Sequence, residues 1–75
     1  MSSPWHGSGR IWQRDIYKGC LVVEYDAEQK LWMWSVERFY GPYGDSKVFA
    51  DGAEKNRKRA QDAADEAYNS GAEDA

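Results

Sequence analysis

The strongest structural signal in this chain lies in residues 20–40, CLVVEYDAEQKLWMWSVERFY. The two ends of this stretch, residues 20–25 and 31–40, are rich in the β-branched and aromatic side chains that favour strands. The residues between them, 26–30, are polar and form a connection short enough to join two antiparallel neighbours. The stretch therefore predicts a β-hairpin.

The register of this hairpin determines which side chains share a face. If residues 27–30 close an even loop, the bulky apolar side chains of both strands lie on one side of the sheet. Opposed there are Leu21 with Val36, Val23 with Trp34, and Tyr25 with Trp32. The other side is half polar and carries Cys20, Val22, Glu24, Met33, Ser35 and Glu37. A slip of one residue, which is the alternative, would move both tryptophans to this second side.

The segments before and after the hairpin are less regular. Residues 11–18 are a weaker strand candidate, and Gly19 then forms either a tight turn or a bulge in one continued strand. Residues 1–10 are rich in serine and glycine and predict a flexible tail. Residues 41–52, GPYGDSKVFADG, predict a loop, within which residues 47–50 form a short edge strand or a plug over one end of the core.

A helix is expected from residue 53 to about residue 70. Asp51 and Glu54 resemble a capping box, and Gly71 stands where a helix C-terminus favours glycine. One helical face is almost entirely alanine and consists of Ala60, Ala63, Ala64, Ala67 and Tyr68. Small side chains let a helix approach a sheet that bears two tryptophans, so the two halves of the sequence are consistent with each other.

These elements predict a small α+β domain over residues 11–71, a three-stranded antiparallel sheet with one C-terminal helix packed on one face. Residues 72–75, AEDA, are expected to form an acidic tail. A chain of 75 residues is one domain with a small core. No apolar run approaches the roughly 20 residues of a membrane span, and the N-terminus does not resemble a signal peptide. The single cysteine fits a reducing compartment, and we expect a cytoplasmic protein.

The sequence contains no pattern typical of a catalytic or metal-binding site. His6, the one histidine, lies in the expected tail, and Cys20 has no neighbouring base, so a packed thiol fits it better than a nucleophile. The sequence has no cysteine and histidine cluster with metal-ligand spacing and no phosphate-binding glycine loop. We therefore expect no enzyme, no cofactor and no metal.

Four cations cluster around the start of the expected helix: Lys55, Arg57, Lys58 and Arg59. Such a cluster is a candidate for phosphate contacts with a nucleic acid. The alternative is a solvated helix face with pairs such as Lys58 with Asp62. The balance of 10 basic and 13 acidic residues, net charge −3, favours this alternative.

The same segment carries a further pattern in Arg57, Lys58, Ala60, Ala63 and Ala64. These residues match the start, KKxAKxxAA, of the last helix in double-stranded-RNA-binding domains, which the segment resembles. The resemblance implies contact with nucleic acid phosphates. The chain departs from that family in Gln61, which replaces the third lysine, in the lack of a first helix, and in the acidic hairpin loop.

Aromatic residues are more numerous than one small core takes up, with Trp 4, Tyr 5 and Phe 2. Aromatic side chains near loops and strand edges often anchor protein interfaces, and carboxylates complement a basic partner. The candidate partner-binding residues are Trp12, Tyr40, Tyr43, Glu24, Glu37 and Asp45. The alternative is a small second core, in which Tyr43 and Phe49 fold under the loop.

In size, acidity, aromatic content and element order the chain resembles short proteins of phages and mobile elements, anti-CRISPR proteins among them. The resemblance implies a stoichiometric inhibitor or adaptor that occupies a site on a host protein, so we expect another protein as the partner. A nucleic-acid-binding module is the alternative. Self-association through the open sheet face or an edge strand, giving a homodimer, is a further one.

Overall fold

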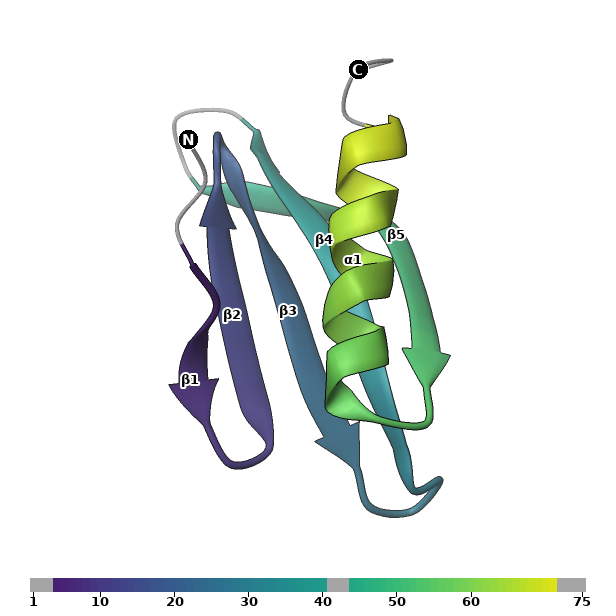
Figure 1. The fold of residues 1–75 in the computed structure, drawn as a ribbon. Helices are drawn as coiled ribbons and strands as arrows, with labels where there is room; N and C mark the ends of the chain where they lie inside the picture. Colours follow the sequence, from purple (N-terminus) through teal and green to yellow (C-terminus); the bar gives the residue numbers. More distant parts are fainter. Residues whose placement is uncertain (1–3, 41–43, 72–75) are drawn as a thin grey trace.

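A computed structural model describes residues 4–40 and 44–71 of the chain (Figure 1). The elements follow one another as β1 (His6–Ser8), β2 (Ile11–Ile16), β3 (Gly19–Asp26), β4 (Leu31–Tyr40), β5 (Asp45–Glu54) and α1 (Arg57–Gly71). The strands form one sheet in sequence order, and each pairs antiparallel with the next. The expected α+β architecture with a C-terminal helix is confirmed, but the expected count of three strands is wrong, because the described residues form a sheet of five.

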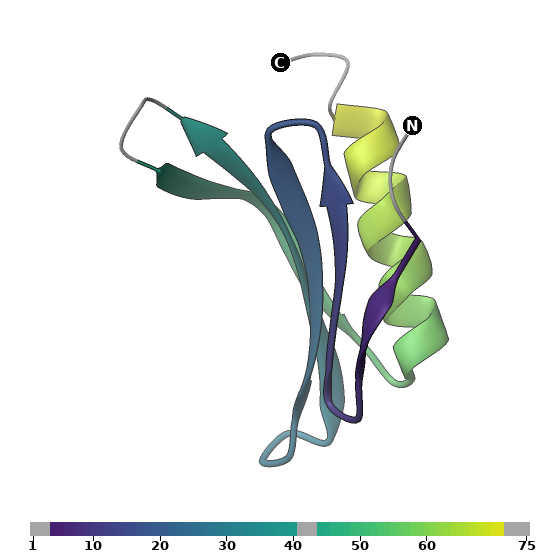
Figure 2. The same cartoon turned by 90° about the vertical axis from the view of Figure 1, so that its left-hand side faces the viewer.

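The helix crosses one face of the sheet and leaves the other face uncovered, as Figure 2 shows from the side. It packs against β3, β4 and β5. The residues that are fully buried between the two layers are Leu21, Val23, Val36, Ala60 and Ala64. Bulky strand residues thus meet small helix residues, as the alanine face predicted, and the backbone of α1 lies close to the sheet.

The register predicted for β3 and β4 is confirmed. Leu21 pairs with Val36, Val23 with Trp34, and Tyr25 with Trp32. Trp34 also pairs with Gly52 of β5, and its indole lies where a side chain at position 52 would stand. Both tryptophans therefore lie on the helix side of the sheet, and the slipped register is excluded.

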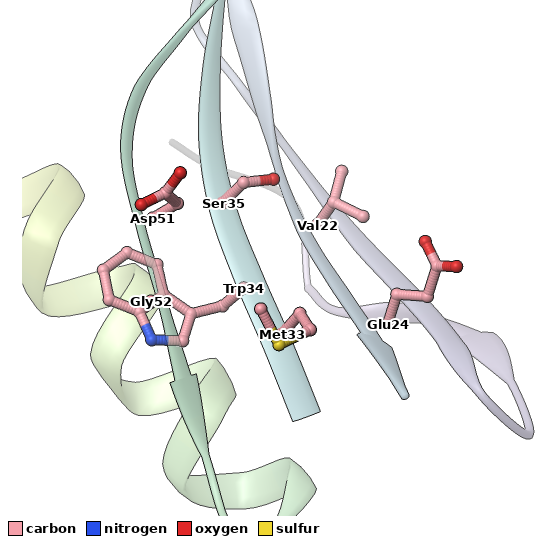
Figure 3. A pocket seen from close by; sticks show the side chains of 7 residues that line it. All are labelled: Val22, Glu24, Met33, Trp34, Ser35, Asp51 and Gly52. Carbon is pink, nitrogen blue, oxygen red and sulfur yellow. The ribbon is translucent and has the colours of Figure 1, made fainter. Parts of the chain in front are cut away.

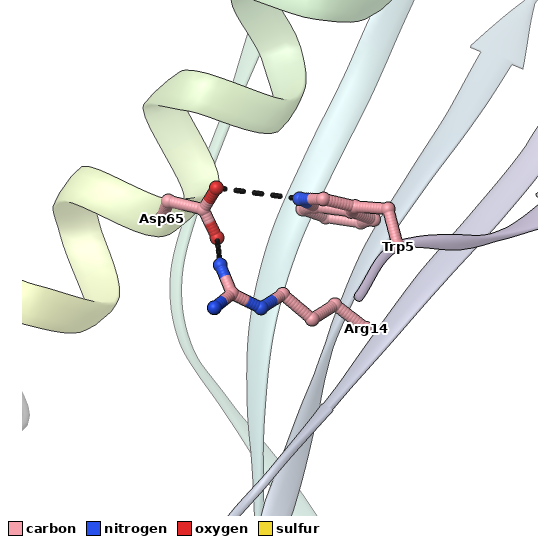
Figure 4. Close-up of polar contacts among 3 residues, drawn as sticks. All are labelled: Trp5, Arg14 and Asp65. Carbon is pink, nitrogen blue, oxygen red and sulfur yellow. Dashed lines mark hydrogen bonds and ion pairs between the residues drawn. The ribbon is translucent and has the colours of Figure 1, made fainter. Parts of the chain in front are cut away.

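Residues 6–8, which the sequence assigns to a tail, form the edge strand β1. Figure 4 shows the contact that anchors this segment: the indole Nε1 of Trp5 donates a hydrogen bond to Asp65 Oδ2 at 3.3 Å. The other carboxylate oxygen of Asp65 accepts from the guanidinium of Arg14 on β2. One aspartate of α1 thus ties together the helix, β2 and the segment before β1, a contact between residues that are 60 positions apart.

Residues 45–54 form a full strand, so the loop prediction for residues 41–52 is wrong over its second part. The edge strand proposed at 47–50 is present but longer, because β5 pairs with β4 along its whole length. The register shifts between Val36 and Glu37, which leaves Phe49 without a partner in β4. This bulge places both Phe49 and Ala50 against the core, and a strand with one such bulge escapes a simple alternation pattern.

The helix begins later than the sequence indicates. Asp51 and Glu54, expected as a capping box, lie in β5, and α1 starts at Arg57. The cap is Asn56, whose Oδ1 accepts the backbone N–H of Arg59 at 2.9 Å. Pairing with β4 holds residues 51–54 extended, so the chain cannot turn into a helix before Glu54. No helix in the described part of the chain is long and apolar enough to cross a membrane.

Candidate interaction surfaces

The uncovered side of the sheet, called the open face below, has three central rows of side chains. Directly opposed residues of antiparallel strands share a face, so the register defines each row. The central rows are Ile11, Glu24, Met33 and Ala53; then His6, Gln13, Val22, Ser35 and Asp51; then Asp15, Cys20, Glu37 and Val48. The pairs Asp26 with Leu31 and Phe39 with Ser46 continue the face at its two ends. The strand residues between these positions point toward α1, since Leu21, Val23 and Val36 are buried there.

The open face carries negative charge without lysine or arginine. The carboxylates of its central rows are Asp15, Glu24, Glu37 and Asp51, and these rows contain no basic side chain except His6. The imidazole Nε2 of His6 lies 3.6 Å from an oxygen of Asp15 at the β1 edge. The strand arginines, Arg14 and Arg38, alternate onto the helix side. The negative potential of this face is therefore little compensated within the face itself.

Large apolar side chains are exposed among these carboxylates. Ile11 is 54% exposed, Met33 37% and Val48 47%. Phe39, which alternates onto this face, extends the exposed apolar surface at the far end of β4 with 46% exposure. Exposed apolar groups rimmed by polar ones are typical of surfaces that bind other proteins.

The structure brings together some of the predicted partner-binding residues and separates others. Glu24 and Glu37 lie on the open face, while Tyr40 and Asp45 oppose each other at the far end of β4 and β5. Trp12 lies on the helix side instead, where it pairs with buried Val23. Tyr43 lies outside the described residues.

Sequence reasoning missed Asp51, Val48 and Ile11 as members of the open face. Asp51 and Val48 belong to β5, which was interpreted as a loop, and their alternation becomes informative only once β5 is paired with β4. Ile11 lies opposite Glu24 through the pairing of β2 with β3. The signal that could have found these residues is the polar and apolar alternation continued across neighbouring strands.

Cys20 carries the thiol of the open face, and its surroundings hold it in the thiol form. Burial of the side chain, followed by the hydrogen bond and negative charge of Glu37 and the charge of Asp15, raises the pKa of Cys20 to about 11. The thiol Sγ lies 3.4 Å from Glu37 Oε2 and donates to it. At neutral pH this thiol is protonated and weakly nucleophilic.

Metal-binding geometry is lacking in the part of the chain that the structure describes. Within residues 4–40 and 44–71, no group of three or more histidine, cysteine, aspartate or glutamate side chains is placed to hold an ion.

The four predicted basic residues lie together at one end of the molecule. Lys55 follows β5, and Arg57, Lys58 and Arg59 begin α1 with exposed side chains. Lys58 lies 3.9 Å from Asp62 in an exposed i,i+4 pair, a contact worth only a few tenths of a kcal/mol. This pair was predicted as part of a solvated helix face.

An aromatic group stands beside these cations. The guanidinium of Arg57 lies 4.4 Å from the ring centroid of Trp12, and that of Arg10 lies 5.4 Å from the ring of Tyr25. Trp12 is itself held by a hydrogen bond from its Nε1 to the carbonyl of Gly9 at 3.1 Å. The described N-terminal segment forms strands, so the chain lacks the first helix of double-stranded-RNA-binding domains there.

Comparison of the chain with family models, with curated proteins and with solved structures finds no match.

Proposed function

We propose that this protein is a non-catalytic binding protein that occupies a site on another protein and acts there as an inhibitor or adaptor. The observation that carries the proposal is the open face, whose central rows have four carboxylates, no lysine or arginine, and exposed apolar side chains between them. The complementary partner is a protein surface that is basic and partly apolar. A nucleic-acid-binding surface of a host protein has this character.

The two components of the open face have different roles in such binding. The carboxylates attract and orient a basic partner and raise the association rate, an effect that weakens with salt. The apolar groups Ile11, Met33 and Val48 contribute affinity when they lose contact with water. Inhibition would be steric, because the bound sheet covers the partner's site and needs no chemical step.

The test compares two variants with the same change of net charge. The protein is immobilised and used to capture partners from the native host, with Glu24→Lys plus Asp51→Lys on the open face in one variant. The matched control carries Asp62→Lys plus Glu66→Lys on the exposed side of α1. We expect a specific host protein to bind the wild type and the control but not the open-face variant. Equal capture by both variants contradicts the proposal.

A second candidate function, nucleic-acid binding at the basic start of α1, is favoured by one observation. Arg57 lies against the ring of Trp12 while Lys58 and Arg59 are exposed beside it, so cations and an aromatic ring share one surface. Side chains of these kinds contact phosphates and stack on bases in nucleic-acid-binding proteins.

Fluorescence anisotropy with duplex and single-stranded probes distinguishes the two functions. At about 150 mM salt, non-specific contacts are already weak, so micromolar binding would indicate a built site. If Arg57→Glu plus Lys58→Glu abolished such binding, the second function would replace the first. We expect no binding at this salt concentration.

A further inference from the structure

A hollow of about 300 Å³ lies on the open face across β3, β4 and β5 (Figure 3). It is lined by Val22, Glu24, Met33, Trp34, Ser35, Asp51 and Gly52. Figure 3 shows the carboxylates of Glu24 and Asp51 on opposite sides of this hollow, with the side chains of β4 between them. The hollow is therefore open to solvent, apolar along its middle and acidic at two separate points.

The apolar side chains that face outward in the hollow are Val22 and Met33. Trp34 borders the hollow from the helix side of the sheet, where its indole occupies the position that a side chain of Gly52 would take. Val22 and Met33 form a surface on which the hydrocarbon part of a long side chain can lie without losing hydrogen bonds to water.

The two carboxylates lack a cationic partner within the described chain. Glu24 and Asp51 are exposed, and neither takes part in an ion pair among residues 4–40 and 44–71. No lysine or arginine of the open face lies near them, so their charges repel anions and favour a cation. They stand on β3 and β5, about 10 Å apart across β4, so both charges attract a cation in the hollow while it bonds one carboxylate at a time.

We propose that this hollow binds an arginine side chain presented by the partner protein, an inference that rests on the proposed function. A guanidinium is planar, carries five N–H donors and is more weakly hydrated than an ammonium group, and it stacks on apolar and aromatic surfaces. The nearer carboxylate accepts its hydrogen bonds while the charge of the other adds to the attraction, the hydroxyl of Ser35 offers a further acceptor, and Met33 and Val22 contact its methylene groups. The ammonium group of lysine is compact and more strongly hydrated, so it lies less favourably on this apolar surface.

Nuclear magnetic resonance with short peptides tests this assignment on the folded protein. The probe is acetyl-Gly-Gly-Arg-Gly-Gly-amide, compared with the same peptide carrying citrulline, the neutral analogue of arginine, or lysine. We expect the arginine peptide to shift the amide signals of Val22, Ser35 and Gly52. Glu24→Gln plus Asp51→Asn should weaken this binding at least about tenfold, since charge-assisted hydrogen bonds are lost. The control, Asp62→Asn plus Glu66→Gln, should leave it unchanged.

The outcomes separate this inference from the proposed function. Equal binding of the citrulline or lysine peptide overturns the assignment to arginine. Absence of any shift at about 10 mM arginine peptide, above the millimolar Kd expected for one side chain, overturns the hollow as a site. If a host protein is still captured through the open face in that case, the proposed function stands without the hollow. If neither peptide binding nor capture of a host protein is observed, both the arginine site and the proposed function are refuted.

Discussion

Gly52 stands where the chain has no room for a methyl group. An ideal Cβ at this position would lie 2.6 Å from Cζ2 and 2.8 Å from Nε1 of Trp34, distances at which atoms overlap. The indole is rigid and packs against the core, so it cannot move aside at little cost. We expect Gly52→Ala to lower the free energy of unfolding by about 1–3 kcal/mol, measured by urea denaturation.

A second variant, in which Trp34 is replaced, provides the control for Gly52→Ala. At an unhindered strand position, replacing glycine by alanine raises stability, because it restricts the unfolded chain. In a Trp34→Leu background, which uncovers position 52, Gly52→Ala should cost clearly less than in the wild type. An equal cost in both backgrounds would assign the loss to the backbone rather than to the indole.

Cys20 makes stability depend on pH in the alkaline range. Its pKa rises from 9.0 to about 11 on folding, so the folded thiol holds its proton more tightly than the unfolded one. The resulting stabilisation is fully present below pH 9 and is lost as the pH rises from 9 through about 11. At pH 8 we expect iodoacetamide to alkylate the folded protein much more slowly than the urea-unfolded chain.

The Cys20→Ala variant isolates this contribution from the lysines and tyrosines that titrate in the same range. Its unfolding free energy should fall less between pH 9 and pH 11 than that of the wild type. Parallel pH profiles for the two proteins would show that the thiol has the same pKa in both states.

The elements whose position is determined by residues close in sequence could be predicted. The elements that are held by contacts with residues far away in the sequence could not. The β3–β4 register follows from a short even loop and the alternation beside it, and the helix face follows from alanine spacing. β1 has only three residues, and its anchor, Trp5 on Asp65, joins positions 60 apart. β5 contains polar residues, a glycine and a bulge, so its composition indicated a loop until β4 was placed beside it.

The candidate sites divide in the same way. Glu24 and Glu37 could be placed on the open face from the sequence, because they alternate with buried residues in strands that were predicted. Asp51, the second carboxylate of the hollow, could not be placed there, since it belongs to β5. Trp12 was expected at an interface, but its ring lies under the guanidinium of Arg57. The pairing of β2 with β3, which the sequence does not determine, places Trp12 on the helix side of the sheet.

The docking of β1 on the sheet depends on Asp65. Replacing Asp65 with alanine removes the acceptor for Trp5 and one partner of Arg14. Hydrogen bonds to a charged group contribute about 1.5–3 kcal/mol, so the amide hydrogens of His6–Ser8 and the indole N–H of Trp5 should exchange at least about tenfold faster. Hydrogen exchange followed by nuclear magnetic resonance measures both.

Glu66→Ala, a neighbouring exposed substitution on α1, is the matched control and should leave exchange at β1 unchanged. A uniform acceleration across all strands in Asp65→Ala would mean that the contact supports the whole fold instead of the edge strand. No acceleration at all would show that β1 is held by its pairing with β2 alone.

The whole molecule separates its core from its exposed apolar groups, which lie on opposite sides of the sheet. The described residues that are fully buried lie between α1 and the sheet, and the exposed apolar side chains Ile11, Met33 and Val48 lie on the other side. The four carboxylates of the central rows lie on this second side too, while the strand arginines point toward α1. One face of the sheet thus supports the core, and the other faces solvent.

Two valines on neighbouring strands test this division directly. Val36 is 0% exposed on the helix side, whereas Val48 is 47% exposed on the open face. Val36→Ala should lower the free energy of unfolding by about 2–3 kcal/mol, because it removes buried methyl groups and leaves a cavity. Val48→Ala removes the same atoms from a solvated position and should cost less than about 1 kcal/mol. Urea denaturation of the two variants gives the comparison.

If Val48→Ala instead cost as much as Val36→Ala, the open face would be covered in solution. A second copy of the chain would then be its first candidate occupant, and sedimentation analysis of the wild type would detect the homodimer as a doubled mass.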